Sequence, residues 1–248
     1  LHAPSEEELE EKDEIIRDNK QSAISILNKK QYTTIKRGFG GGRTEVFKLY
    51  KKWTNDSGEL KKKGVYGKYI DIVSLYPTCQ FLDYLPYGKP QHFTDINDTD
   101  ISKYFGFVRC DITPPKNLHI PLLGGKQVIN GETKFCFGLN KMKDVVYSTE
   151  ELKKAVSIGY VINKVYEVFH FKKTKGLFKS YIRSFMKGKI CGGGHSGTYQ
   201  EKTKYCEDYK NKFGIKIKPE ELIKNSGMKA VSKLCLNSLW GKFAMRQM

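Results

Sequence analysis

A single carboxylate, that of Asp71, lies in an otherwise apolar and aromatic stretch of the chain, the sequence YIDIVSLYP. The apolar side chains of this stretch, bounded by a glycine and a proline, predict a buried strand; they are Ile70, Ile72, Val73 and Leu75. An unpaired carboxylate in such a strand costs several kcal/mol unless a cation or backbone N–H groups meet it. Two interpretations of Asp71 therefore stay open: a strand end that accepts backbone N–H groups, or a group that holds a metal ion.

The residues that follow Asp71 suit a site for a divalent metal and for phosphate groups. A Ser-Leu-Tyr-Pro turn, residues 74–77, comes directly after the strand. A carboxylate can hold Mg²⁺, the backbone amides of a turn can face phosphates, and the Tyr76 ring can close over a sugar. These residue types in this order favour the metal-binding interpretation.

Polar residues near the end of the sequence share one face of a predicted helix. Lys229, Lys233, Asn237 and Trp240 follow each other at i, i+4, i+8 and i+11, which is one face at about 100° per residue. Two ammonium groups one turn apart repel each other unless an anion lies over both. The spacing of the two lysines therefore favours a phosphate site over a solvated stripe.

The sequence Asp-x-x-Ser-Leu-Tyr-Pro that begins at Asp71 resembles motif A of the family B DNA polymerases. The resemblance implies that Asp71 is one of two metal-binding catalytic aspartates and that the backbone carbonyl of Ile72 also binds the metal. It implies that Ser74 and Leu75 lie under the triphosphate of the incoming nucleotide. Tyr76 would be the ring that excludes a ribose 2′-OH, the group by which a protein tells RNA from DNA.

The sequence Lys-x-x-x-Asn-Ser-x-Trp-Gly that begins at Lys233 resembles motif B of the same family, with a Trp where Tyr is usual. The resemblance implies that three lysines contact the triphosphate: Lys189, Lys229 and Lys233. The full nucleotide-binding set that it implies is Ser74, Leu75, Tyr76, Lys189, Lys229, Lys233, Asn237 and Trp240. The motif B residues that it places against DNA are Ser238, Gly241 and Lys242.

A glycine-rich segment, Gly-Phe-Gly-Gly-Gly-Arg at residues 38–43, precedes motif A. It is either a flexible loop before a strand or a place where the backbone approaches a phosphate chain, with Arg43 adding charge. Aromatic-x-Gly-Gly at this distance before motif A resembles the template-contacting loop of protein-primed polymerases. The DNA-binding residues implied there are Phe39, Gly41, Gly42 and Arg43, with Phe39 where a Tyr is usual.

The resemblance implies an α+β fold: a palm of antiparallel strands, an inserted α/β subdomain and helical fingers. The segments that follow from it are residues 1–37 as a connector helix, 38–92 as the palm part with the glycine loop and motif A, 93–172 as an insertion like the terminal-protein region of protein-primed polymerases, and 173–248 as fingers with motif B.

Local patterns predict the elements inside these segments. The predictions are a helix over 6–29, strands over 44–52 and 65–75, a turn at 85–88, a helix that begins with the capping box of Ser148 and Glu151 and ends at Gly159, a strand over 161–171, and a glycine-rich break over 188–197. Asp-Thr-Asp at 98–100 is the core of polymerase motif C, but it precedes motif B and lacks the usual Tyr. We therefore interpret it as a loop and helix cap.

The composition of this 248-residue chain indicates a polyanionic partner, because its net charge is +17. Residues 1–18 carry eight acids and two bases, so the remaining sequence is more basic still. Six scattered cysteines without a C-x-x-C pair indicate reduced thiols, as in a nucleus, cytoplasm or viral factory. No apolar run is long enough to span a membrane, and we expect no membrane partner.

The resemblance implies template-directed DNA synthesis by two-metal nucleotidyl transfer from dNTPs, with two Mg²⁺ ions and a DNA template and primer. A terminal priming protein would be a further partner. Motif C, which would supply the second aspartate, is not present in the sequence, which ends shortly after motif B. Two further hypotheses stay open: a catalytically inactive, polymerase-derived DNA-binding remnant, and a basic structural or ribosome-associated protein.

Overall fold

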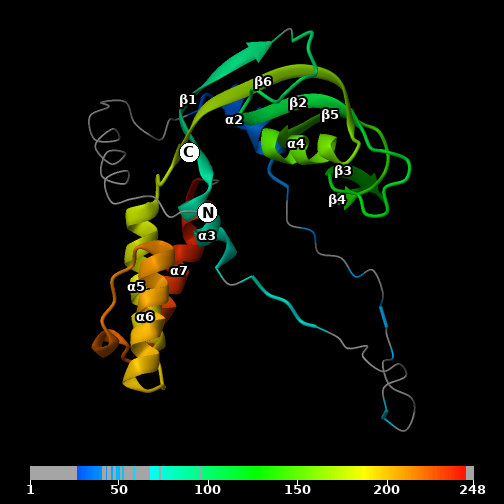
Figure 1. The fold of residues 1–248 in the computed structure, drawn as a ribbon. Helices are drawn as coiled ribbons and strands as arrows, with labels where there is room; N and C mark the ends of the chain where they lie inside the picture. Colours follow the sequence, from blue (N-terminus) through cyan, green and yellow to red (C-terminus); the bar gives the residue numbers. More distant parts are fainter. Residues whose placement is uncertain are drawn as a thin grey trace.

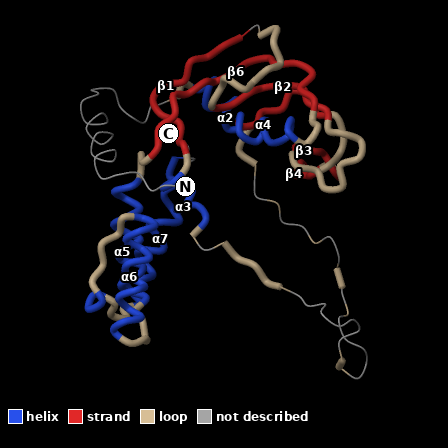
Figure 2. The backbone as a smooth tube through the Cα atoms, viewed as in Figure 1, coloured by secondary structure: helices blue, strands red, loops and turns tan. Residues whose placement is uncertain are grey.

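The computed structural model describes residues 27–40, 68–72, 74–94 and 96–243, together with residues 43, 46, 49, 50, 52, 58 and 59. Its elements form two bodies (Figure 1): an antiparallel sheet with helices α2 and α4, and a group of helices α3, α5, α6 and α7. Figure 2 shows the strands gathered in the first body and most of the helical residues in the second. The predicted helix over 6–29 lies outside the described residues, apart from its last three positions.

The main sheet has the strand order β1-β6-β2-β5, and every neighbouring pair is antiparallel. Its strands are β1 (Tyr84–Thr94), β2 (Gly106–Thr113), β5 (Met142–Ser148) and β6 (Val161–Lys175). A separate hairpin pairs β3 (Gly124–Ile129) with β4 (Glu132–Phe137). The expected strand over 161–171 is confirmed, and it continues four residues further.

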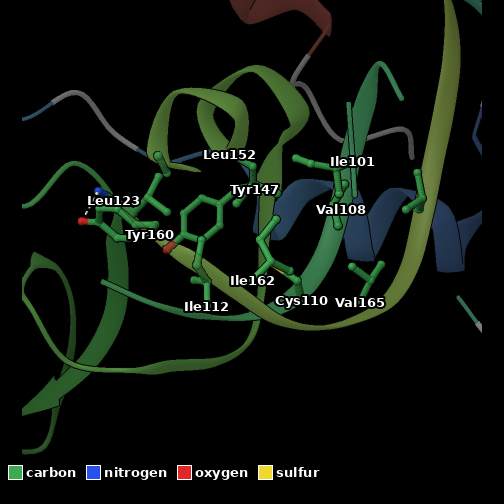
Figure 3. Packing of buried hydrophobic residues seen from close by; sticks show 12 residues of the cluster. Ile101, Val108, Cys110, Ile112, Leu123, Tyr147, Leu152, Tyr160, Ile162 and Val165 are labelled. Carbon is green, nitrogen blue, oxygen red and sulfur yellow. Dashed lines mark hydrogen bonds between the residues drawn. The ribbon is translucent and has the colours of Figure 1, made fainter. Parts of the chain in front are cut away.

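Helix α4 (Thr149–Ser157) covers one face of the sheet. The predicted capping box is present: the Ser148 side chain accepts from the Glu151 N–H, and the Glu151 carboxylate accepts from the Ser148 N–H. Alternate residues of β2 point at this helix, and Figure 3 shows them packed with Leu152 and Tyr147. The fully buried members are Val108, Cys110, Ile112 and Leu152. Burial raises the pKa of the Cys110 thiol to about 12, so this cysteine stays a neutral thiol in the core.

Helix α2 (Lys29–Arg37) lies against the opposite face, where Ile35 packs on Phe169 and Phe171 of β6.

A row of charged groups also crosses the sheet. The buried Glu167 carboxylate meets His92 Nε2 at 2.7 Å and Arg109 Nη1 at 3.2 Å. Arg109 also donates to Asp144 and thereby lowers the pKa of that carboxyl. The buried acid is therefore paired on two sides, as a buried charge must be.

The helical body has its own core, formed by helices far apart in the sequence: α3 (Leu75–Leu82), α5 (Lys179–Gly193), α6 (Tyr199–Phe213) and α7 (Ser226–Phe243). A short 3₁₀ helix, Pro219–Glu221, begins with a proline. The most buried side chains of this core are Leu236, Ile182 and Ile215. Among the described helices, none is long and apolar enough to cross a bilayer.

Several expectations about local structure are wrong. The described part of the predicted strand 65–75 forms no strand, and Ile70 and Ile72 are 73% and 64% exposed, because no described strand pairs with it. Its last residue, Leu75, instead begins helix α3. The predicted turn at 85–88 lies within β1, where the register shifts between Tyr87 and Gln91. The segment 97–100 is a loop, as expected, but Asp100 caps the turn at Ser102 rather than a helix.

The core under α4 gives a prediction about stability. Leu152→Ala is expected to lower the free energy of unfolding by about 2–5 kcal/mol, because it leaves a cavity at a fully buried position. Val156→Ala on the same helix is the matched control, since Val156 is 46% exposed and its loss is expected to cost less than about 0.5 kcal/mol. Urea titration of both variants measures the difference. Equal losses would show that α4 does not pack as described.

Candidate functional site

Two glycines let helices α5 and α7 approach each other closely. A Cβ atom on Gly188 would lie 2.5 Å from Ser232 Oγ, and a Cβ atom on Gly192 would lie 2.9 Å from the backbone nitrogen of Lys229. Both distances are shorter than any normal carbon contact, so a methyl group at Gly192 would collide with backbone atoms and one at Gly188 would force Ser232 to move. The predicted break over 188–197 is wrong in its first part, because these glycines pack against α7 and the helix continues through Gly193. Its second part is confirmed, since residues 194–198 are not helical.

The start of α7 is fixed against the end of α5 by hydrogen bonds. The Asn225 backbone N–H donates to the Gly192 carbonyl at 2.9 Å, and the Asn225 side chain accepts from the Met228 N–H. Further along, the Tyr181 hydroxyl donates to the Cys235 carbonyl at 3.0 Å. These contacts set the rotation and height of α7, and with them the positions of its lysines relative to α5.

Helix α3 brings the Ser-Leu-Tyr-Pro sequence to the same place. Its N-cap residue Ser74 has φ 56° and ψ 40°, a left-handed conformation that non-glycine residues rarely adopt. The Ser74 side chain makes no capping hydrogen bond to this helix. The buried faces of Pro77 and Phe81 hold α3 against α5 and α7. The first turn of α3 thus carries the backbone N–H groups of Leu75 and Tyr76 at the positive end of the helix dipole.

Lys189 of α5 joins the two halves of the site. Its Nζ donates to Ser74 Oγ at 2.5 Å. Burial lowers the pKa of Lys189, and the positive charges of Lys233 and Lys229 lower it further. Lys189 therefore stands at the N-terminus of α3 with the positive charges of Lys229 and Lys233 near it. Such an arrangement is unfavourable in the free protein and is stabilised when an anion binds among the three lysines.

The predicted metal ligands lie on an exposed segment just before this site. Asp71 and Ile72 are both exposed, and Asp71 is three residues before Ser74. Within the described ranges, no group of three or more His, Cys, Asp or Glu side chains is placed to hold a metal ion. Mg²⁺ can be held by one or two carboxylates together with substrate phosphates. Asp71 therefore fits as one ligand of a phosphate-bound ion, whereas a second ion would need a further carboxylate.

The other residues predicted for this site are exposed or outside what the structure describes. Asn237 and Ser238 are exposed on α7, one turn beyond Lys233. A Cβ on Gly241 would meet nothing within 4 Å. Tyr76 is 55% exposed beside the start of α3. The side chains of Trp240 and Lys242 are outside what the structure describes, so their predicted contacts stay predictions.

The glycine loop lies against the sheet body. The Phe39 ring is 5.2 Å from that of Phe107, and the Arg43 guanidinium stacks 4.0 Å from the centre of the Phe137 ring. Arg43 also donates to the Pro121 carbonyl. Gly41 and Gly42 lie outside the described residues. The expected DNA contacts of this loop stay predictions.

Sequence reasoning missed the residues that position the lysines. Gly188 and Gly192 are four residues apart on α5, and Ser232 faces Gly188 from α7. Small residues at i and i+4 on a predicted helix are a sign of close helix packing, because they share one face. That spacing could have identified the α5–α7 contact in the sequence.

The chain matches the family of type B DNA polymerases of organelles and viruses over residues 8–192 and 194–248, and it belongs to that family. It is 25% identical over 221 residues to a probable DNA polymerase of Ascobolus immersus, covering 89% of this chain and 14% of that protein. It is 27% identical over 221 residues to the DNA polymerase of Bacillus phage phi29, covering 87% of this chain and 32% of that protein. The chain thus spans about a third or less of the length of these relatives.

Solved structures of phi29 DNA polymerase show the same fold. The complex with primer-template DNA and incoming nucleotides matches with a TM-score of 0.53 at 23% identity, covering 95% of this chain and 35% of that chain. The complex with primer-template DNA alone matches with a TM-score of 0.50. The mixed α/β architecture with an antiparallel sheet is therefore the one that this polymerase has.

The glycine contacts predict that alanine substitutions at the neighbouring positions 192 and 193 have different effects on stability. Gly192→Ala is expected to lower the free energy of unfolding by about 1–3 kcal/mol, because its methyl group would collide with the backbone of α7. Gly193→Ala is the control: nothing lies within 4 Å of its Cβ, and alanine is expected to be neutral or to stabilise the helix by up to about 1 kcal/mol. Guanidinium denaturation measures both. A Gly192→Ala variant as stable as Gly193→Ala would contradict the close packing.

Proposed function

We propose that this chain carries part of the active site for template-directed DNA synthesis from dNTPs, by two-metal nucleotidyl transfer. The observation that carries the proposal is the hydrogen bond of Lys189 to Ser74 at the N-terminus of α3, with the charges of Lys229 and Lys233 near Lys189. Membership of the type B polymerase family supports it. In this proposal residues 93–172, with β2 to β5, α4 and most of β6, are the insertion, α3 and most of β1 belong to the palm part, and α5–α7 are the fingers.

Each residue of the site has a distinct task in this reaction. The three lysines hold the triphosphate and offset the charge that develops on it during transfer. The N–H groups of Leu75 and Tyr76 face the phosphates from the helix terminus. Ser74 keeps Lys189 oriented through their hydrogen bond. Lys189 therefore exchanges a neutral partner for an anion when the nucleotide binds.

The remaining motif residues select and align the substrates. Tyr76 is exposed next to the phosphate-binding turn, where its ring can exclude a 2′-OH. Asn237, Ser238 and Gly241 follow Lys233 along α7 toward the base pair and the DNA. Asp71 and the Ile72 carbonyl would hold Mg²⁺, which supplies Lewis-acid activation of the attacking hydroxyl and of the triphosphate.

We extend the proposal to a protein-primed start, with DNA template and primer, dNTPs and a terminal protein as partners. The order of the motifs and the sheet inserted between them support it, together with the phi29 structures that contain primer-template DNA and nucleotides. We also propose a reducing compartment, since the described cysteines are all free thiols. A catalytically inactive remnant is not favoured, because the lysines, Ser74, Tyr76 and Asp71 are all present.

The lowered pKa of Lys189 predicts proton uptake when a triphosphate binds. A bound anion favours the charged form of Lys189 and so raises its pKa. At a pH between the pKa of the free protein and that of the complex, binding is therefore accompanied by proton uptake. Calorimetry of dNTP binding should therefore give buffer-dependent enthalpies at alkaline pH, just below the ordinary lysine pKa, and buffer-independent ones at neutral pH. Lys189→Gln should abolish the dependence, whereas Lys134→Gln on β4 should leave it intact. Buffer-independent binding by the unaltered chain at both pH values would contradict the site.

The role of Asp71 is tested by primer extension in the whole protein. Asp71→Asn is expected to lower extension by at least about a hundredfold, because it removes a ligand of ions that supply several kcal/mol of transition-state stabilisation. Binding of primer-template DNA should be retained. Asp98→Asn, in the exposed Asp-Thr-Asp loop, is the control and should extend normally. Normal extension by Asp71→Asn would sink the proposed role.

A further inference from the structure

The two bodies are joined by a two-stranded ribbon, formed by residues 84–87 of β1 and 172–175 of β6 and called here the basic ribbon. Figure 1 shows both strands leaving the sheet toward the helices. On one strand α3 ends at Leu82 and β1 begins at Tyr84; on the other β6 ends at Lys175 and α5 begins at Lys179. The ribbon is therefore continuous with both helices that meet at Ser74 and Lys189.

One face of the basic ribbon holds two lysines against a single ring. Tyr84 pairs with Lys175 across the strands, and Lys173 is two residues before Lys175 on the same face. The Lys173 and Lys175 ammonium groups lie 4.7 and 4.6 Å from the centre of the Tyr84 ring. All three residues are exposed. Two positively charged ammonium groups therefore contact the same Tyr84 ring, called here the Tyr84 platform.

The ribbon has no acid of its own to offset this charge. The sequence contains no Asp or Glu from 84 to 94 or from 168 to 176, but it contains Lys89, Lys172, Lys173 and Lys175. Burial and the nearest acid on β1's side, Asp83, raise the pKa of the Cys79 thiol, and among the described residues no ion pair joins Asp83 to Lys173 or Lys175. On β6 the nearest acid is Glu167, which is buried and paired with His92 and Arg109. An anion from outside the chain would relieve the repulsion.

We propose that the basic ribbon binds the phosphodiester backbone of nucleic acid, through Lys173 and Lys175 on the Tyr84 platform. Clustered cations beside an exposed ring are the combination that holds a nucleic-acid backbone without reading its sequence. The inference deepens the proposed function, on which it rests for the identity of the anion. It extends the proposed nucleotide contacts, at the start of α3 and near the end of α5, onto the connection to the sheet, outside both sequence motifs.

The test is binding of the full 248-residue chain to labelled DNA, without nucleotide or Mg²⁺, over a range of salt. Fluorescence anisotropy is measured with a primer–template duplex and with a single strand of equal length. The Lys173→Gln/Lys175→Gln variant is expected to reduce the slope of log K against log salt by about 2, or about 1 for each lysine. Affinity at 0.1 M salt should fall on the order of tenfold or more.

The matched control removes the same charge from lysines that already lie near acids. Lys134 pairs with Glu132 at 3.1 Å. Lys164 stacks 4.7 Å from the Tyr166 ring, whose hydroxyl bonds Asp111. Lys134→Gln/Lys164→Gln should change the slope much less. A selective loss for the ribbon variant on either probe supports the proposal and shows whether the duplex or the single strand is bound.

Equal losses in the two variants, or no loss in either, would overturn the ribbon proposal. Thermal unfolding of both variants checks that they are folded, which is expected because all four lysines are on the surface. The outcome is independent of catalysis. If Asp71→Asn abolishes extension while the ribbon variant binds DNA like the control, only the ribbon proposal fails. If the ribbon variant loses DNA binding selectively while Asp71→Asn extends normally, only the proposed role of Asp71 fails.

Discussion

The close contact of α5 with α7 is the constraint on which the candidate site depends. Without Cβ atoms on Gly188 and Gly192, the two helices approach until side chain and backbone nearly touch. That approach places Lys229 and Lys233 close enough to Lys189 to lower its pKa. Two contributions to stability oppose each other here. The contact buries apolar side chains, which stabilises the helix pair, but it also brings three positive charges near one another, which destabilises it. The excess positive charge is what prepares the site for an anion.

Paired and unpaired charges are found in different parts of the molecule. In the sheet body the charges are paired, as in the row from His92 through Glu167 to Arg109. The basic ribbon carries three lysines and no acid, and Lys189 beside Ser74 lies near two further lysines. These two places keep a positive field, whereas Lys187 elsewhere on α5 is paired with Glu221.

The sequence predicted local features better than long-range packing. The spacing of Lys229 and Lys233 and the capping box at Ser148 follow from local rules, and the structure confirms that both lysines lie on α7 and that the capping box begins α4. Long-range relations were not predictable in this way. The exposed segment at Ile70 was expected to be buried because an apolar run lies there between a glycine and a proline, but burial of a strand depends on a partner that local sequence does not reveal. The glycines of α5 were interpreted as a break because their packing against α7 is also a long-range contact, which local sequence does not reveal.

The exposed segment at residues 68–72 shows what the site would need to become complete. Its side chains Tyr69, Ile70 and Ile72 are all more than 60% exposed, and its backbone forms no ladder with any described strand. Exposed apolar residues in an extended segment are favourable only when a neighbouring strand covers them. A strand that paired with this segment and carried a carboxylate would bury Ile70 and Ile72 and bring that carboxylate beside Asp71 in the same step. Completion of the sheet and completion of a two-metal site would then be one structural event.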